Sequence, residues 1–339
     1  MTAVTDLADL LVEMVDVPSV TGDEAPFARL VAGHLREAGY DVRRQEAASG
    51  RENLLATRGT PRVLFSTHLD TVPPHLPARR EGDRVFGRGA CDPKGPLAAM
   101  FEASRRLTGR AAEEAGFLLV VGEEVDHCGA RAATRLLMEG KAPEAILLGE
   151  PTENRMARAQ KGVLRLVVRA TGKAGHSGYP EIGPSAIDRL VDALALLRKT
   201  DWPADPQRGA TTLNVGVIRG GVAANVIAPA AEAELLFRLV GEPGVVLDRL
   251  STLLGGSFEA HVVSSHPPLD LPVLEGFPAT VVSFHSDASI LQEIAPVYLM
   301  GPGDIRVAHS DQERISLDDV RRGADLYERA ALQILEGNR

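Results

Sequence analysis

The sequence predicts an α/β protein with a main domain, built on a largely parallel central sheet flanked by helices, and an inserted α+β sandwich domain. Short apolar runs alternate with amphipathic helical stretches before about residue 150 and again after about residue 269. This alternation is typical of a parallel sheet covered by helices. Between these parts, apolar and polar residues alternate strictly, which indicates strands with one solvated face. We therefore expect a main domain of residues 1–160 and 269–339, and an inserted domain of residues 161–268.

The main domain is expected to begin with two helices. Apolar residues recur at helical spacing between about residues 5 and 15, and residues 22–40 form a second amphipathic stretch that closes at Gly39. Strands then alternate with helices. The strands are expected at residues 62–70, 116–124 and 144–152. A turn followed by a helix is expected within residues 91–107, and another helix at residues 130–140.

The inserted domain is expected to follow the order strand, helix, two strands, helix, strand, which forms a small sandwich of its own. After it the α/β pattern returns, with two strand-like stretches and a closing helix at about residues 317–335. The inserted strands are expected at residues 162–172, 211–221, 231–240 and 257–266, and the inserted helices at about residues 184–198 and 246–254.

Composition narrows the class of protein. The 339 residues carry a formal net charge of -9, and 44% of them are hydrophobic. An acidic chain without a basic patch argues against a nucleic-acid surface and against anionic membranes. No apolar run approaches the roughly 18 residues of a membrane span. With two cysteines and no signal-peptide pattern, we expect a cytoplasmic protein.

Acidic residues and histidines gather where the predicted strands end. Ligands of an open parallel sheet bind beyond the carboxyl ends of its strands. Four strand ends carry such residues, and a further aspartate stands in a glycine-rich turn before a helix. A mixture of imidazole and carboxylate suits zinc or another divalent transition metal. The residues concerned are His68, Asp70, Asp92, Glu123, Glu124, Glu150 and His309.

Other interpretations apply to single features. One histidine or glutamate at a strand end is usually a solvated loop residue. The turn "GRGACDPKG" could bind phosphate, but it lacks the GxxxxGK[ST] form. Asp126 and His127 lie past a strand end and are interpreted as ordinary loop residues. Cys91 and Cys128 are interpreted as inert. The convergence of several acids and histidines at one sheet edge is what favours a metal site.

The motifs also occur in a recognisable order. "STHLDTVP", "GRGACDPKG", "VVGEEV", "LLGEPT", "AGHSG", "LNVGVIRGG" with "ANVIAP", and "GPGDIRVAHSDQE" run over nearly the whole chain. This series resembles the dinuclear-zinc amidohydrolases that include acetylornithine deacetylase, succinyl-diaminopimelate desuccinylase, aminoacylase and glutamate carboxypeptidase. The resemblance implies two divalent metal ions, zinc or else cobalt. It also implies a homodimer whose inserted domain serves as a lid and for dimerisation.

The resemblance assigns metal ligands. His68, Asp92 and Glu150 would bind one metal ion. Asp92, Glu124 and His309 would bind the other, with Asp92 bridging the two. Several carboxylates are needed beside two neighbouring dications, because they offset the positive charge.

It also assigns two roles outside the ligand set. Asp70 would accept a hydrogen bond from the His68 ring and fix its tautomer. Glu123 would be the general base for the attacking water, and a base that must later release its proton should not be tied to a metal. The Asp92–Pro93 bond is expected to be cis; the alternative is an ordinary turn proline.

By the same resemblance, His176 in "KAGHSGYP" would reach the active site of the partner subunit and stabilise the oxyanion. The alternative is a simple turn histidine. Asn225 and Arg238 match positions that hold the substrate carboxylate, for which a guanidinium is well suited. Leu236 stands where the family often has an aspartate, so Arg238 could instead be a charge on a strand face.

The stretch "HSDAS", with Ser286 and Asp287, matches a loop near the substrate in that family. Ser286 is therefore a candidate substrate contact. The usual Gly-Thr before it is replaced by Phe284 and His285, which leaves the identity of the substrate open.

The expected activity is hydrolysis of the amide bond of an N-acyl amino acid. "GPGDIRVAH" with "DQE" favours an enzyme like acetylornithine deacetylase in amino-acid biosynthesis. A desuccinylase, or cleavage of a dipeptide by an exopeptidase, is the alternative. An inactive binding protein would have lost a ligand or the base, and none is lost. A dehydrogenase would need a glycine fingerprint after the first strand, and "FSTHLDTVPP" holds none.

Overall fold

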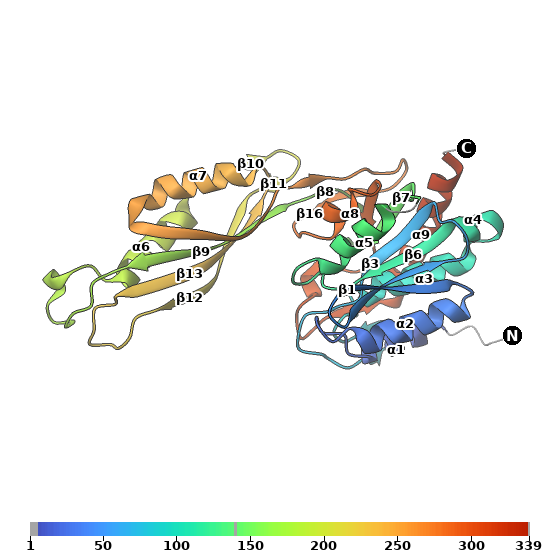
Figure 1. Cartoon of the computed structure of the whole chain (residues 1–339), viewed down its shortest axis with the longest axis horizontal. Helices are drawn as coiled ribbons and strands as arrows, with labels where there is room; N and C mark the ends of the chain where they lie inside the picture. The colour runs from blue at the N-terminus through green and yellow to red at the C-terminus, as the bar shows by residue number, and fades with distance from the viewer. Residues whose placement is uncertain (1–5, 139–140, 338–339) are drawn as a thin grey trace. The chain divides into compact units, whose positions relative to one another are not determined.

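The computed structural model describes residues 6–138 and 141–337. These residues fold into two compact units (Figure 1). The first unit comprises the described residues up to Arg158, together with Leu271–Thr280 and the described residues from Ser286 onward. The second unit comprises Ala159–Asp270 and Val281–His285. Residues 139 and 140, where a helix was expected to end, lie outside the described residues.

The first unit is built on a six-stranded sheet in the order β1-β2-β6-β3-β7-β17. The four strands from β6 to β17 are parallel, and the β1–β2 hairpin joins them antiparallel. This confirms the predicted α/β class with a largely parallel sheet. The strands are β1 (Asp41–Ala48), β2 (Arg51–Thr57), β3 (Val63–His68), β6 (Ala115–Val120), β7 (Ala145–Gly149) and β17 (Val297–Met300).

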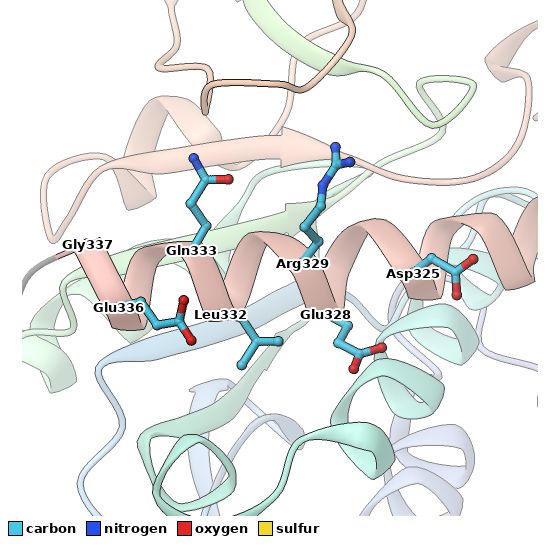
Figure 2. Close-up of a pocket in the computed structure, with 7 residues that line it drawn as sticks. All are labelled: Asp325, Glu328, Arg329, Leu332, Gln333, Glu336 and Gly337. Atoms are coloured by element: carbon cyan, nitrogen blue, oxygen red, sulfur yellow. The ribbon is translucent and has the colours of Figure 1, made fainter.

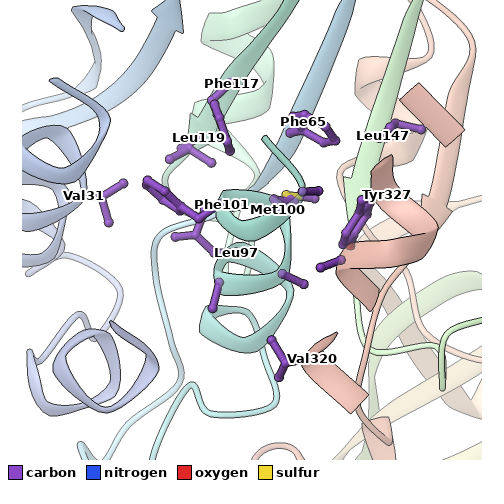
Figure 3. Packing of buried hydrophobic residues seen from close by; sticks show 14 of the residues in the cluster. Val31, Phe65, Leu97, Met100, Phe101, Phe117, Leu119, Leu147, Val320 and Tyr327 are labelled. Atoms are coloured by element: carbon purple, nitrogen blue, oxygen red, sulfur yellow. The ribbon is translucent and has the colours of Figure 1, made fainter. Parts of the chain in front are cut away.

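Helices cover this sheet because their apolar faces join its buried residues in one continuous core. In Figure 3, Phe101 on α3 packs beside Phe117 on β6, with Tyr327 of α9 nearby. The ring centroids of Phe117 and Phe101 are 5.3 Å apart, and those of Phe117 and Phe65 are 5.4 Å apart. The helices are α1 (Leu7–Asp16), α2 (Ala25–Glu37), α3 (Lys94–Arg106), α4 (Gly109–Glu114), α5 (Cys128–Met138), α8 (Ala288–Leu291) and α9 (Leu317–Gly337), with the 3-10 turn η3 (Ile305–Val307).

A small antiparallel sheet links distant parts of the first unit. Its order is β18-β5-β4, with bounds Arg314–Ser316, Arg84–Phe86 and Arg79–Glu81. Arg314 pairs with Phe86, so the segments that follow β5 and precede β18 begin side by side.

The second unit has an antiparallel sheet in the order β12-β13-β9-β14, with α6 and α7 against one face. Along β9 and β13 every second residue is buried, as the alternating pattern predicted. Its elements are β9 (Gly162–Thr171), η1 (Pro180–Ile182), α6 (Ala186–Lys199), β10 (Ala204–Asp205), β11 (Gly209–Ala210), β12 (Thr212–Gly220), β13 (Ala230–Leu239), α7 (Pro243–Leu254), η2 (Gly255–Ser257) and β14 (Phe258–His266).

Three short strands lie in the chain segments that run from one unit to the other. They form a small sheet in the order β15-β8-β16, with bounds Leu269–Asp270, Met156–Gln160 and Ala279–Val282. Among the described residues, no helix is both long and apolar enough to cross a membrane.

Candidate metal centre

Three neighbouring parallel strands end at the centre. His68 is the last residue of β3, and it pairs in register with Val120, the last residue of β6. The turn after β6 carries Glu123 and Glu124, and Glu150 directly follows β7. Parallel strands place their carboxyl ends at the same edge of a sheet, so the backbone positions of these residues lie close together.

Asp92 lies between two imidazoles. His68 Nε2 is 3.0 Å from Asp92 Oδ1, and His309 Nε2 is 3.6 Å from Asp92 Oδ2. His309 Nε2 also lies 3.0 Å from Glu124 Oε1. One ligand atom each from His68, Asp92 and Glu124 all lie within 4.8 Å of one another. The two oxygens of Asp92 thus face different histidines, as a carboxylate shared by two ions would require.

Charge at the centre also fits divalent cations. Glu150 is buried, and no described residue donates a hydrogen bond to its Oε1. A buried carboxylate oxygen without a donor is costly unless a cation compensates it. Burial raises the pKa of Glu150 well above its usual range, and the negative charge of Asp92 raises it further. The oxygen and imidazole donors gathered here therefore fit zinc-like ions.

The histidine contacts shift the pKa values of Asp92 and His309 in opposite directions. Burial alone would raise the pKa of Asp92, but hydrogen bonds from His309 and His68 outweigh burial and hold it below its usual value. Hydrogen bonds to Asp92 and Glu124 raise the pKa of His309 to about 10. Acids and bases therefore stabilise each other's charged forms at this site.

Asp70 holds the turn that carries both glutamates. Its Oδ1 accepts hydrogen bonds from the amides of Gly122 and Glu123 at 2.9 and 3.2 Å, and its Oδ2 accepts one from the amide of Glu124 at 3.3 Å. The His68 ring was expected to face this carboxylate. His68 Nδ1 lies 2.9 Å from the backbone carbonyl of Asp70 and 3.5 Å from its Oδ1. Either acceptor leaves Nε2 as the nitrogen that points to Asp92.

The described backbone includes two cis peptide bonds and, at His309, a left-handed residue of the candidate centre. The Asp92–Pro93 peptide bond is cis, which confirms the prediction, and the Pro73–Pro74 bond is also cis, which was not predicted. His309 has a φ of 60°, in the left-handed region that non-glycine residues rarely occupy. A left-handed non-glycine residue persists where its surroundings impose this conformation, and such residues are enriched at functional sites.

Comparison with known proteins identifies the family. The sequence profile described as "Peptidase family M20/M25/M40" matches residues 64–333. The chain belongs to peptidase family M20. An Aspergillus clavatus protein named "Probable carboxypeptidase" is 33% identical over 384 residues, which cover 96% of this chain and 82% of that protein. The protein is therefore a metal-dependent hydrolase.

Solved structures share the fold of this M20 chain. A tripeptidase from Staphylococcus aureus has a TM-score of 0.80 at 22% identity, covering 96% of this chain and 98% of that one. A Bacillus subtilis protein described as a dinuclear metal-binding peptidase of the M20 family has a TM-score of 0.72 at 14% identity, covering 98% of both chains. At these identities the likeness concerns the fold alone.

Near the candidate metal ligands of this M20 protein lies a histidine–aspartate contact that the sequence did not reveal. His127 was interpreted as an ordinary loop residue, but its Nδ1 lies 2.8 Å from Oδ1 of Asp287, which is almost fully buried. Ser286 is also buried, and its Oγ accepts a hydrogen bond from the Ala288 amide at the start of α8. The "HSDAS" motif was the available signal for Asp287, although nothing in the sequence pointed to His127 as its partner.

The remaining candidates belong to the second unit. His176 is exposed in the loop after β9, and its backbone forms a β-bridge with Val226. The Ser177 amide donates a hydrogen bond to the carbonyl of Asn225 at 3.1 Å, so the loops of His176 and Asn225 lie together. Arg238 is half-buried in β13, opposite Thr212 of β12 and Val163 of β9.

A hollow of about 670 Å³ lies along α9 and includes none of these residues; Figure 2 shows the side chains that line it. It is lined by side chains of one helix and includes none of the candidate ligands. Its lining residues are Asp325, Glu328, Arg329, Leu332, Gln333, Glu336 and Gly337.

Proposed function

We propose that the protein hydrolyses the amide bond of a small N-acyl amino acid or short peptide at a centre of two divalent metal ions. The observation that carries this proposal is the position of Asp92, with one carboxylate oxygen toward His68 and the other toward His309. Zinc is the proposed metal, with cobalt as the alternative. The proposed ligands are His68, Asp92 and Glu150 for one ion, and Asp92, Glu124 and His309 for the other.

Two such ions, when bound, polarise the amide carbonyl and make water a better nucleophile near neutral pH. Glu123 is the proposed general base. Burial raises its pKa well above the usual range, and the neighbouring carboxylates of Glu150, Asp287 and Glu124 raise it further. A carboxylate with a raised pKa can hold the proton taken from water and then give it to the leaving nitrogen. Asp70 keeps Glu123 in place through the backbone amides of the turn.

The proposed substrate carries a free carboxylate beside the cleaved bond. Arg238 offers a guanidinium for such a group, and Asn225 lies in the loop next to His176. Ser286 is a further proposed substrate contact; its hydroxyl is buried and accepts a hydrogen bond from the Ala288 amide. His176 is proposed to stabilise the oxyanion in the active site of the partner subunit.

Two substrate classes have support. The carboxypeptidase name of the Aspergillus clavatus relative favours cleavage of a C-terminal residue from a short peptide. The motif "GPGDIRVAH" with "DQE" favours deacylation like that of acetylornithine deacetylase. Removal of a succinyl group by a desuccinylase is the alternative within this class. Both classes share the free carboxylate. We place the enzyme in the cytoplasm, supported by the free thiols of Cys91 and Cys128.

A homodimer through the second unit is part of the proposal. β12 is an edge strand of its sheet, and Ile218 on it is exposed. Ile187 and Val191 of α6 are also exposed, and Ile187 lies against Gly220 at the end of β12. An apolar strip beside an open strand edge suits the same strip of a second copy.

A hydrolysis panel tests this function. Metal-free protein is reloaded with zinc or cobalt and offered N-acetylornithine, N-succinyl-diaminopimelate and dipeptides, each dipeptide paired with its C-terminal amide. We expect at least one carboxylate substrate to be hydrolysed, and its amide to be slower by about 100-fold or more in kcat/KM, because the polar groups that bind the carboxylate lose their partner. Equal rates for a dipeptide and its amide would disprove carboxylate recognition, and no hydrolysis by the reloaded protein would disprove the activity.

A further inference from the structure

Glu313 is a buried carboxylate that accepts hydrogen bonds from backbone amides of the loop that contains Asp92. It is 1% exposed, and its Oε1 accepts hydrogen bonds from the amides of Gly89, Cys91 and Asp92 at 2.9, 3.2 and 3.2 Å. Its Oε2 accepts one from Arg88 Nη1 at 2.6 Å. An ionised carboxylate can accept four such bonds, whereas a neutral amide of the same size would turn a donor toward one of these groups.

Arg88 fastens the same loop to the segment that bears His309. It is 2% exposed and donates hydrogen bonds to the carbonyls of Ser310 and Pro74 at 3.4 and 3.2 Å. The amide of Gly87 donates to the carbonyl of Glu313 at 3.1 Å, and β5 pairs with β18 just beyond. Residues 87–92 and 309–313 are therefore joined by side chains and backbone together.

These two segments each supply a ligand of the proposed centre. Asp92 comes from the first and His309 from the second, and their nearest ligand atoms are 3.6 Å apart. A shift of either segment would change the distance between the shared carboxylate and an imidazole. Metal sites are sensitive to such shifts, because coordination requires ligand atoms within a few tenths of an ångström of their ideal positions.

We propose that Glu313, together with Arg88, is a positioning residue of the metal centre: it sets Asp92 relative to His309, so that the two ions bind together. This inference rests on the proposed ligand set. Arg62 and Glu114 provide a matched comparison, because they form an ion pair at 3.0 Å in the same unit and involve none of the proposed ligands.

The test compares Glu313→Gln with Glu114→Gln and the wild type. Metal-free protein is titrated with cobalt and zinc against a chromophoric chelator, and the visible absorption spectrum of the cobalt-loaded protein is recorded. For Glu313→Gln we expect about 10- to 100-fold weaker binding of at least one ion and an altered cobalt spectrum. Excess metal should restore most of the lost activity. Glu114→Gln should bind metal like the wild type, even if its melting temperature falls.

Each outcome decides between the two proposals. Wild-type affinity and an unchanged spectrum in Glu313→Gln would overturn the positioning role and leave the proposed function intact. A wild-type protein that binds neither metal would overturn both. If Glu313→Gln does not fold, Arg88→Lys replaces it, because this change keeps the charge but removes the contacts with Pro74 and Ser310. Weaker metal binding by Arg88→Lys supports the role, and unchanged binding refutes it.

Discussion

Two adjacent glutamates at the end of β6 have different neighbours and therefore different chemistry. Glu124 Oε1 lies 3.0 Å from His309, whereas burial and three surrounding carboxylates raise the pKa of Glu123. Adjacent carboxylates would normally repel each other. Here the turn places Glu124 beside an imidazole and Glu123 among other carboxylates, which supports the proposal that one strand end supplies both a metal ligand and a general base.

Replacing the base should separate binding from catalysis. We expect Glu123→Gln to lower kcat by about 10²- to 10⁴-fold, because the amide cannot take a proton from water. Its metal content should match the wild type, because Glu123 is not a proposed ligand. Steady-state kinetics on the substrate found in the panel, with metal analysis of the same samples, measure both. Glu37→Gln, on an exposed position of α2, is the control. Full activity in Glu123→Gln would show that another group is the base.

Replacing Asp70 should disturb the turn without removing a ligand. Asp70→Asn would place an NH₂ group against some of the amides of Gly122, Glu123 and Glu124, which now donate to the carboxylate. We expect activity or metal affinity to fall by about 10- to 100-fold. Kinetics and metal titration measure the loss, with Asp23→Asn at an exposed position as the control. Unchanged values in Asp70→Asn would mean that the turn keeps its shape without this acceptor.

The sequence pointed to the residues of the centre because each one ends a strand or stands in a recognisable turn. Parallel strands bring such ends together wherever they stand in the sequence. Glu313 could not be interpreted in this way. Its partners Gly89, Cys91 and Asp92 precede it by more than 200 residues and contribute backbone amides, which leave no trace in the sequence. The contact of His127 with Asp287 joins two side chains, and it was missed because these residues lie 160 positions apart in the sequence.

At the scale of elements, strands with a continuous apolar run or a regular alternation of apolar and polar residues were predictable, whereas the charged hairpin at the edge of the main sheet was not. β3 and β6 are continuous apolar runs that are buried throughout, so their composition identifies them. The β1–β2 hairpin was not predicted. Half of the residues of β1 are charged and only Val42 is buried, so no apolar run marks it as a strand.

The aromatic cluster around Phe117 joins the central sheet to a helix that covers it, and its loss should lower the stability of the protein strongly. Phe117 on β6 is fully buried against Phe65, Phe101 and Tyr40. We expect Phe117→Ala to lower the free energy of unfolding by about 3–5 kcal/mol, because it leaves a cavity in a rigid core. Chemical denaturation of the metal-free protein measures the change. Met138→Ala, at an exposed position of α5, should stay within about 0.5 kcal/mol of the wild type. Equal stability of the two variants would contradict this packing.

At the scale of the whole molecule, the apolar strip on the second unit predicts the oligomeric state. We expect the wild type to sediment as a dimer, and the double variant Val191→Glu with Ile218→Glu to sediment as a monomer, because burying carboxylates in the interface is costly. Leu196→Glu is the control, since Leu196 is exposed on a different side of α6. Analytical ultracentrifugation at micromolar concentration measures the mass. A dimeric double variant would place the interface elsewhere.

If His176 of each subunit acts in the active site of the other subunit, two inactive variants should regain activity when they form a mixed dimer. A His176→Ala dimer lacks the oxyanion group in both active sites, and a Glu123→Gln dimer lacks the base in both. In a mixed dimer, the site with an intact Glu123 receives the intact His176 of the other chain. Random exchange makes half of the dimers mixed, each with one complete site, so the mixture should recover about a quarter of wild-type activity.

The mixing experiment also distinguishes action of His176 in the partner's active site from action in the active site of its own chain. The two variants are mixed after reversible dissociation in mild denaturant, and each variant alone passes through the same treatment as its control. If His176 acted on the centre of its own chain, the chain with Glu123 would still lack the histidine, and no mixture would gain activity. Recovery should also disappear when both variants carry Val191→Glu and Ile218→Glu, because subunits that do not associate cannot complete each other's sites.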